Sequence, residues 1–281
     1  MKIAVLITVH NRIEKTLFCL KCLYKQNSGI NFEVYLTDDG SNDGTSEILN
    51  NEFPQVKIIQ GNGSLFWNRG MISAWRAATN SDDYDFYLWL NNDTFLLENS
   101  INELLSSFHQ AKLREGNDCI IIGSCKENFD SNHFSYGGRN HLGPVLPGKE
   151  IQEIKYMNGN LVLISKNIYK ILGTNSHLYK HSFGDYDYGL RANQNNIKCF
   201  IARGYLAVCE KNNNQLICFD SEYSILERIN NIYQDGGFNL KDYLAYRKKF
   251  FKKSYYISFF KLFLKVIFVK SYPRIKKYLK I

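Results

Sequence analysis

Several features that would place this chain of 281 residues in a common class are absent from its sequence. The most apolar stretch, residues 255 to 269, is about fifteen residues long and contains Lys261 and Lys265, so it is too short and too charged to cross a bilayer. The opening segment MKIAVLITVHNR lacks a small-residue cleavage site after its apolar run. It therefore predicts a buried strand and a cytoplasmic start rather than a signal peptide.

The common nucleotide-binding fingerprints are also missing. The chain has no GxxxxGK[ST] segment and no GxGxxG after its first strand-like run, which disfavours P-loop ATPases and dehydrogenases. Seven cysteines without regular spacing indicate free thiols in a reducing compartment rather than a disulfide framework. Cys19 and Cys22 form a CxxC, but they lie in an amphipathic helical pattern without a second pair, so core packing is expected rather than zinc binding.

The sequence does contain regularly spaced strand patterns. Apolar runs at 3–9, 32–37, 56–60 and 84–90 alternate with helical or glycine-rich connections at a βαβ period, and a helix at 98–109 and a strand at 119–123 continue the series. This predicts an α/β fold with a mostly parallel central sheet flanked by helices. Asn11, with Glu14 three residues later, predicts a capping box at the first helix.

Polar side chains follow the second and fourth of these strands. Asp38 and Asp39 end one strand in DDGSNDGT, and Asn91, Asn92 and Asp93 end the other. Because ligands bind outside the carboxyl ends of strands in open α/β sheets, both ends should line one crevice. Asp38 or Asp39 would accept hydrogen bonds from a nucleotide, and at the same time Asp43 and Ser41 would cap the next helix. A calcium loop is not favoured, because its twelfth position would be an asparagine.

Two further features suit a diphosphate. The segment from Gly61 to Trp75 is a glycine-rich turn leading into a helix, and Arg69 lies near the expected start of that helix, where its charge and the helix dipole would attract phosphate. A surface arginine without this role is the alternative. Asn91 and Asp93 have the spacing of an Asn-x-Asp triplet that would hold magnesium or manganese through oxygen ligands, with the diphosphate supplying others.

Six motifs in order resemble family 2 glycosyltransferases of the GT-A fold, in their rhamnosyltransferase-like branch. They are TVHNR (8–12), DDGSNDGT (38–45), GNGSLFWNRG (61–70), LNNDT (90–94), NGNLVLISK (158–166) and FGDYDYGLR (183–191). The resemblance implies a nucleotide-sugar donor, a divalent metal at Asp93 and a catalytic base in the last motif. The residues expected to bind the donor are Thr8, Asn11, Arg12, Asp38, Asp39, Arg69, Asn91 and Asn92.

The last motif departs from the family pattern. Gly184 stands where such families usually have glutamate, which leaves Asp185 as the expected base. Asp187 would lie on the acceptor side or form an i,i+4 ion pair with Arg191. Gly159 and Asn160 match an acceptor position, although a turn before a buried strand explains them equally well. Relatives sometimes add a late histidine as metal ligand, but the comparable stretch here reads YLAVCEK, with Cys209.

The charge distribution predicts the domain organisation. Residues 241–281 contain thirteen Lys/Arg against one Asp, a net +12, whereas residues 1–240 contain 22 basic and 26 acidic residues, a net −4. We expect a glycosyltransferase domain at 1–240, with a nucleotide-binding half at about 1–125 and an acceptor half at about 126–240, followed by a basic, aromatic, amphipathic helical tail at 241–281. The tail would bind a membrane surface or pack on the domain; nucleic-acid binding is not expected without a recognised motif.

The resemblance implies an inverting glycosyltransferase that uses a saccharide or lipid-linked saccharide acceptor in bacterial surface polysaccharide synthesis. Together with the cationic aromatic tail, it indicates a peripheral location on the inner face of the plasma membrane. Two alternatives remain open. One is a non-catalytic, membrane-associated nucleotide-sugar-binding protein, suggested by Gly184. The other is a sugar nucleotidyltransferase, which should carry a glycine-rich, arginine-containing loop where this chain has TVHNR.

Overall fold

The computed structural model describes residues 1–26, 29–212, 216–235 and 238–278. The chain divides into two compact units. The first unit contains Met1–Ser176 and Asp185–Lys211, and the second contains His177–Gly184 and Asn212–Ile281. All seven cysteines are free thiols, as the sequence predicted.

A ten-stranded sheet with strand order β10-β13-β6-β12-β4-β1-β2-β3 forms the centre of the first unit, with β5 paired to β13 and β7 paired to β6. A separate three-stranded sheet has the order β11-β8-β9. The strands are β1 (Lys2–Val9), β2 (Asn31–Asp38), β3 (Lys57–Gln60), β4 (Phe86–Leu90), β5 (Phe95–Leu96), β6 (Ile120–Lys126), β7 (Phe134–Tyr136), β8 (Gly138–Asn140), β9 (Gly143–Pro144), β10 (Gln152–Ile154), β11 (Tyr156–Met157), β12 (Leu161–Ser165) and β13 (Cys199–Val208).

The sheet is parallel in its first half and mixed in its second. Strand β1 pairs in parallel with β2 and β4, so that Leu6 lies opposite both Tyr35 and Trp89. Strand β12 is antiparallel to both β4 and β6, which makes the complete sheet mixed. The carboxyl ends of β1, β2 and β4 therefore meet at one edge. The strand order reverses between β1 and β4, and this is where open α/β sheets bind their ligands.

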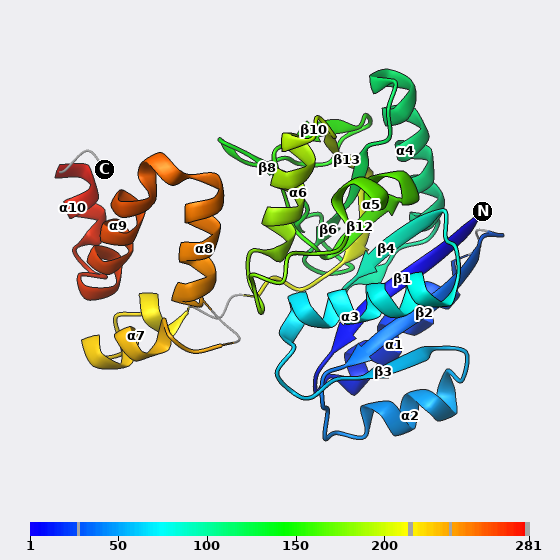
Figure 1. The fold of residues 1–281 in the computed structure, drawn as a ribbon, viewed down its shortest axis with the longest axis horizontal. Coiled ribbons are helices and arrows are strands. Elements are labelled where there is room, and N and C mark those ends of the chain that lie inside the picture. Colours follow the sequence, from blue (N-terminus) through cyan, green and yellow to red (C-terminus); the bar gives the residue numbers. More distant parts are fainter. Residues whose placement is uncertain (27–28, 213–215, 236–237, 279–281) are drawn as a thin grey trace. The chain divides into compact units, whose positions relative to one another are not determined.

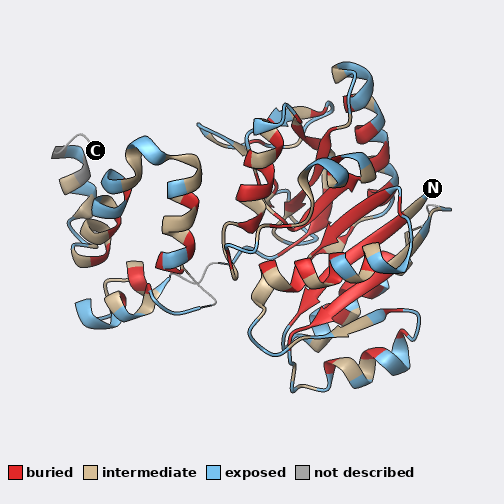
Figure 2. Cartoon of the chain, viewed as in Figure 1, coloured by how far each residue is buried: buried red, intermediate tan, exposed pale blue. Residues whose placement is uncertain are grey.

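Helices cover both faces of this sheet (Figure 1). They are α1 (Ile13–Tyr24), α2 (Thr45–Glu52), α3 (Phe66–Ser81), α4 (Ser100–Glu115), α5 (Lys166–Leu172) and α6 (Gly184–Gln194). Successive side chains of a strand face opposite sides, and β1 shows this directly. Val5 and its alternate neighbours join the core formed with α1, α2 and α4, whereas Leu6 joins the core formed with α3, α5 and α6. Figure 2 shows the resulting buried strands between partly exposed helices.

The start of α1 differs from the expected capping box. Arg12 occupies the N-cap position and makes no side-chain cap. Instead, the backbone N–H of Ile13 donates to the Asp43 carboxylate at 3.1 Å. Asn11 has a positive φ of 50°, and its side-chain oxygen accepts from the Asn42 N–H. The cap therefore comes from the loop after β2, which ties the ends of β1 and β2 together.

The second unit is helical. It contains α7 (Ile225–Asn231), α8 (Leu240–Phe250), α9 (Tyr255–Ile267) and α10 (Tyr272–Tyr278), with short 3₁₀ helices at Ile217–Phe219 and Lys252–Ser254. Its core is formed by Cys218, Ile232, Leu240, Leu262 and Val266. The segment expected as a helical tail thus shares a core with residues that precede it. Among the described residues, no helix is both long and apolar enough to span a membrane.

Candidate active site

The Asp39 carboxylate fixes the loop before α3. Its two oxygens accept backbone N–H groups from Gly63 at 2.9 Å, Leu65 at 2.9 Å and Phe66 at 2.8 Å. Charge-assisted bonds of this kind are stronger than neutral ones, and they satisfy backbone donors at the helix start that would otherwise lack partners. Asp39 is buried, with only 4% of its surface exposed. Asp39 therefore holds the GNGSLFW loop, and its direct contact with a nucleotide stays a prediction.

Asp38 is similarly engaged within its own turn. It accepts the Ser41 N–H at 2.9 Å and the Ser46 hydroxyl, and it is buried. Close backbone approach locks this turn to the loop before α3. A Cβ added to Gly40 would lie 2.9 Å from the Gly63 nitrogen, and one added to Gly61 would lie 2.8 Å from the Asp39 Cα. Only glycine fits these two positions, so the ends of β2 and β3 form one packed surface.

Arg12 and Asp93 join the ends of β1 and β4. The Arg12 Nη1 donates to Asp93 Oδ2 at 2.7 Å, with side-chain exposures of 52% and 25%. The other carboxylate oxygen lies 3.8 Å from the Cys209 thiol at the end of β13. Burial, together with the neighbouring Asp93 charge, raises the pKa of Cys209 to about 12. The thiol is therefore protonated at neutral pH and donates weakly to the carboxylate.

Asn91 connects this edge to the loop before β12. Its backbone N–H donates to the Asn160 carbonyl at 2.9 Å, and its side-chain oxygen accepts the Trp67 indole N–H at 2.7 Å. The side chain of Asn160 in turn donates to the Cys209 sulfur at 3.4 Å. Asn160 is thus bonded on one side to the LNNDT segment and on the other to the thiol that contacts Asp93.

Asp185, in the first turn of α6, lies against the same loop. One of its oxygens accepts the Gly159 N–H at 3.0 Å, and the other accepts the Tyr186 N–H at 2.8 Å. Gly159 is wedged between two side chains, since an added Cβ would lie 2.5 Å from the Trp67 ring and 3.3 Å from the Asp185 Cβ. Burial raises the pKa of Asp185 to about 6, although both N–H bonds act in the opposite direction.

Two of the remaining predicted residues, Thr8 and Asn92, pack or bond within the first unit. Thr8 is buried against Gly70 of α3, where an added Cβ would lie 2.1 Å from the threonine hydroxyl. Asn92 is buried and donates to the Thr16 hydroxyl at 3.1 Å. Arg69 lies in the first turn of α3, as expected from its position after the glycine-rich turn.

Asp187 forms the ion pair that the sequence allowed. It is fully buried, and it accepts the Arg191 Nε–H at 2.7 Å. The same guanidinium donates to the carbonyls of Leu172 and Thr174. This arrangement ties α6 to the end of α5.

Two features of the site were missed by reasoning from the sequence. The sequence did not predict a role for Trp67, although its indole donates to Asn91 and its ring packs against Gly159. It also did not predict that Cys209 lies beside Asp93. The tryptophan within the GNGSLFWNRG motif could have indicated the role of Trp67, whereas the position of Cys209 depends on the pairing of β13 with β6.

Solved structures with a similar fold include a mannosyltransferase and a second protein that was solved with a nucleotide sugar. The mannosyltransferase PcManGT from Pyrobaculum calidifontis, in complex with GDP-Man and Mn²⁺, matches with a TM-score of 0.56 and 11% identity, covering 88% of this chain and 64% of that chain. TarS 1–349 from S. aureus, in complex with UDP-GlcNAc, matches with a TM-score of 0.57 and 15% identity, covering 95% of this chain and 82% of that chain. The chain thus spans less than two thirds of the mannosyltransferase's length.

These likenesses define the class of fold as GT-A, which confirms the α/β expectation. The sequence model of the family described as glycosyl transferase family 2 matches residues 4–176, which is more than half of this chain. The chain therefore belongs to glycosyl transferase family 2. No curated protein sequence matches it.

Proposed function

We propose that this protein is an inverting glycosyltransferase that moves a sugar from a nucleotide-diphosphate donor to a saccharide or lipid-linked saccharide. The observation that carries the proposal is the Asp185 carboxylate, held by the Gly159 N–H beside Trp67 with a pKa raised to about 6. Such a pKa suits a general base at neutral pH, because the group is ionised yet remains basic enough to accept a proton.

Donor binding is assigned to the edge formed by β1, β2 and β4. The interlocked turns after β2 and β3 present a rigid surface, and Arg12 and Arg69 supply positive charge for a diphosphate. Both solved structures described above are complexes with nucleotide sugars, which supports this donor class. The six ordered motifs also lead us to propose the rhamnosyltransferase-like branch of the family.

The residues fit a divalent ion of the magnesium type. Within the described part of the chain, no group of three His, Cys, Asp or Glu side chains could hold a metal on its own. Mg²⁺ is commonly bound through one or two carboxylates and substrate phosphates, and Asp93 offers one partly exposed carboxylate. We propose Mg²⁺ or Mn²⁺ at Asp93. When bound there, the ion would neutralise the charge that develops on the departing diphosphate.

The chemistry then falls to Asp185. Its carboxylate accepts the proton of the acceptor hydroxyl while that oxygen bonds to the anomeric carbon. The bond from the anomeric carbon to the diphosphate oxygen breaks on the opposite side, and the nucleoside diphosphate leaves. Asp93 and Asp185 suit these two roles because the Gly159–Asn160 dipeptide links them: Gly159 bonds to Asp185, and Asn160 bonds to the Cys209 thiol beside Asp93.

We place this activity in bacterial surface polysaccharide synthesis, with the protein peripheral on the inner face of the plasma membrane. The family membership and the basic composition of residues 241–281 support this location. We propose the acceptor side at Gly159 and Asn160, with Asp187 contributing through α6, where it is buried in its ion pair with Arg191.

A panel of nucleotide sugars, incubated with Mn²⁺ and assayed for released nucleoside diphosphate, tests the proposal. One donor should be hydrolysed, and Asp185→Asn should lower the rate of nucleoside diphosphate release by about 10²–10⁴-fold while nucleotide binding by calorimetry persists. The exposed Asp130 offers a control as Asp130→Asn. Nucleotide binding without any turnover would show a non-catalytic binding protein. Formation of nucleotide sugar from a sugar phosphate and a nucleoside triphosphate would show a nucleotidyltransferase.

A further inference from the structure

Helix α9 is apolar on two opposite sides. Ser258, Leu262 and Val266 recur every four residues and are buried on the inner side. Tyr256, Phe260 and Leu264 recur with the same spacing, each two residues before one of these buried residues. Two residues are about half a helical turn, so these three side chains lie on the opposite side of the helix. The inner side forms the core of the second unit with Cys218 and other residues, so packing already accounts for it.

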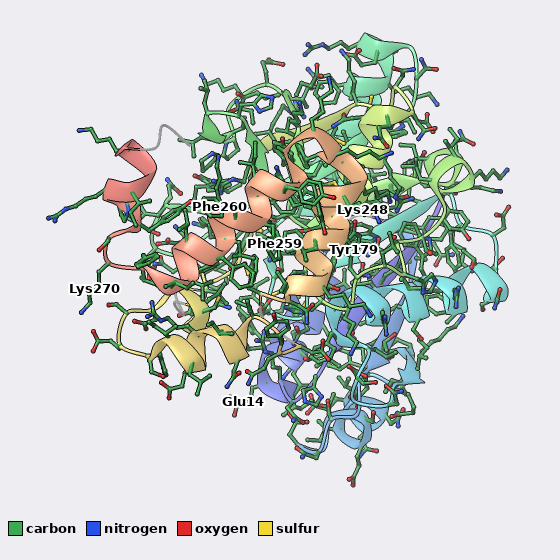
Figure 3. The ribbon with its side chains drawn as sticks, turned by 60° about the vertical axis from the view of Figure 1, so that its left-hand side comes forward. Glu14, Tyr179, Lys248, Phe259, Phe260 and Lys270 are labelled. Carbon is green, nitrogen blue, oxygen red and sulfur yellow. The ribbon has the colours of Figure 1, made fainter. Side chains whose placement is uncertain are left out.

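The outer face of α9, defined as Tyr256, Ile257, Phe260 and Leu264, takes no part in that core as far as the structure describes the chain. Tyr256 is 82% exposed, Phe260 55% and Ile257 52%. Figure 3 shows Phe260 on this helix, together with the exposed neighbour Phe259. A surface helix ordinarily turns charged side chains toward water. A contiguous exposed apolar surface instead marks a site of interaction with a protein or a membrane.

The lysines of α9 flank this face. Lys261 is four residues after Ile257 and three before Leu264, so it borders the outer face, and Lys265 follows one turn later. Both lysines are partly buried, and the Lys265 ammonium lies 3.7 Å from the centre of the Phe219 ring. The outer face itself carries only apolar and tyrosine side chains.

Exposed cations bracket the outer face along the chain. Lys252 and Lys253 precede α9, and Lys270 follows it, labelled in Figure 3; all three are exposed. Within the described residues, no carboxylate pairs with any of the three. Residues 241–281 carry a net +12, so two copies of this face would repel each other, whereas an anionic surface would be attracted.

We propose that the outer face of α9 inserts at the headgroup boundary of an anionic lipid bilayer, with Lys252, Lys253 and Lys270 contacting lipid phosphates. This deepens the membrane location in the proposed function, on which it rests, but it does not depend on catalysis. Amphipathic helices bind in this way by burying apolar side chains, and each basic residue near an anionic leaflet contributes about 1 kcal/mol.

Co-sedimentation of the full chain with vesicles of phosphatidylcholine alone or with one-third phosphatidylglycerol tests the proposal. We expect binding to the anionic vesicles that weakens with salt. Tyr256→Ser/Phe260→Ser should reduce the partition coefficient at least tenfold, and Lys252→Gln/Lys253→Gln should reduce it by a comparable factor. Leu113→Ser/Leu142→Ser, which removes two exposed leucines elsewhere, is the matched control and should bind normally.

Each contrary outcome has a distinct meaning. Absence of wild-type binding would overturn the proposal, as would loss only in the lysine variant, which would indicate adsorption without insertion. A dimer in analytical ultracentrifugation that Tyr256→Ser/Phe260→Ser dissociates, without vesicle binding, would assign the face to a second copy. Thermal unfolding of each variant confirms that it is folded. Asp185→Asn should bind vesicles normally, so failure of the catalytic proposal is read separately from failure of this one.

Discussion

Arg12 Nη1 lies 2.7 Å from Asp93 Oδ2, and this ion pair joins the ends of the two strands between which the sheet order reverses. Arg12 and a divalent cation would compete for the same carboxylate. We expect a cation bound at Asp93 to weaken this ion pair and so to free the Arg12 guanidinium for a diphosphate. Without a cation, the Asp93 charge neutralises that of Arg12.

Arg12→Ala should tighten the binding of Mn²⁺ alone by about three- to fivefold, because a half-exposed ion pair contributes up to about 1 kcal/mol. Electron paramagnetic resonance titration of free Mn²⁺ measures this. Lys15→Ala is the control, since it removes another exposed basic side chain that pairs with Glu210 at 3.6 Å. Unchanged or weaker Mn²⁺ binding in the Arg12 variant would contradict the competition.

The pH profile of the reaction should show an ascending limb with a midpoint near 6. Burial raises the pKa of Asp185 to about 6, and only the ionised carboxylate accepts a proton, so activity rises as pH increases through this value. Stability changes in the opposite direction from activity. Because the pKa of Asp185 is higher in the folded state than in the unfolded state, the unfolding free energy of the wild type falls as pH rises from about 4 to about 6. Asp185→Asn lacks this titration and should not show the fall. Initial rates and urea denaturation at several pH values check both trends.

Asp187→Asn should destabilise the fold by about 2–4 kcal/mol, because it weakens a buried ion pair and leaves the Arg191 charge without its carboxylate. The carbonyls of Leu172 and Thr174 still accept from Arg191 and limit the loss. Urea denaturation gives the change in unfolding free energy. A stable variant with a raised acceptor KM would instead assign Asp187 to acceptor binding.

Asp39→Asn should weaken the loop before α3, because one amide oxygen replaces two carboxylate oxygens that accept three backbone N–H groups. We expect a loss of about 2–3 kcal/mol, since an unsatisfied buried donor costs about 1–3 kcal/mol. Hydrogen exchange at Gly63, Leu65 and Phe66 should accelerate selectively. Exchange that rises equally throughout the first unit would argue against a local clamp.

Gly159→Ala should lower both stability and turnover, because its Cβ would lie 2.5 Å from the Trp67 ring and would press on Asp185. Overpacking of this kind costs about 1–3 kcal/mol. Gly148→Ala is the matched control, since its Cβ would meet only the Gln152 side chain at 3.5 Å. Equal effects of the two substitutions on kcat would separate Gly159 from the site.

The sequence predicted the parts of the fold that depend on local pattern. The apolar runs at 3–9, 32–37 and 84–90 correspond to β1, β2 and β4, because alternating burial leaves a periodic signal in the chain. The rule that parallel strand ends share one edge then predicted that β2 and β4, which precede Asp39 and Asp93, end at the same edge, as the pairing of both strands with β1 confirms.

The long-range contacts were beyond that reasoning. The bond from Ile13 to Asp43 spans 30 residues, and the contact between Cys209 and Asp93 spans 116. Both depend on how loops meet after the sheet has formed, and no periodicity records them. The composition of α9 was visible, but which of its apolar sides would be buried depended on the partners supplied by α7 and α8.

The second unit is formed by two separate stretches of chain, His177–Gly184 and Asn212–Ile281, and this limits where a truncated protein can end. Asp242 accepts the Lys180 N–H at 3.0 Å, and Leu262 and Val266 cover Cys218 and Ile232. A fragment ending at residue 240 would leave that small core open to water and the 177–184 loop without its anchor. Such truncations should yield insoluble material, so point substitutions rather than deletions suit genetic work on this region.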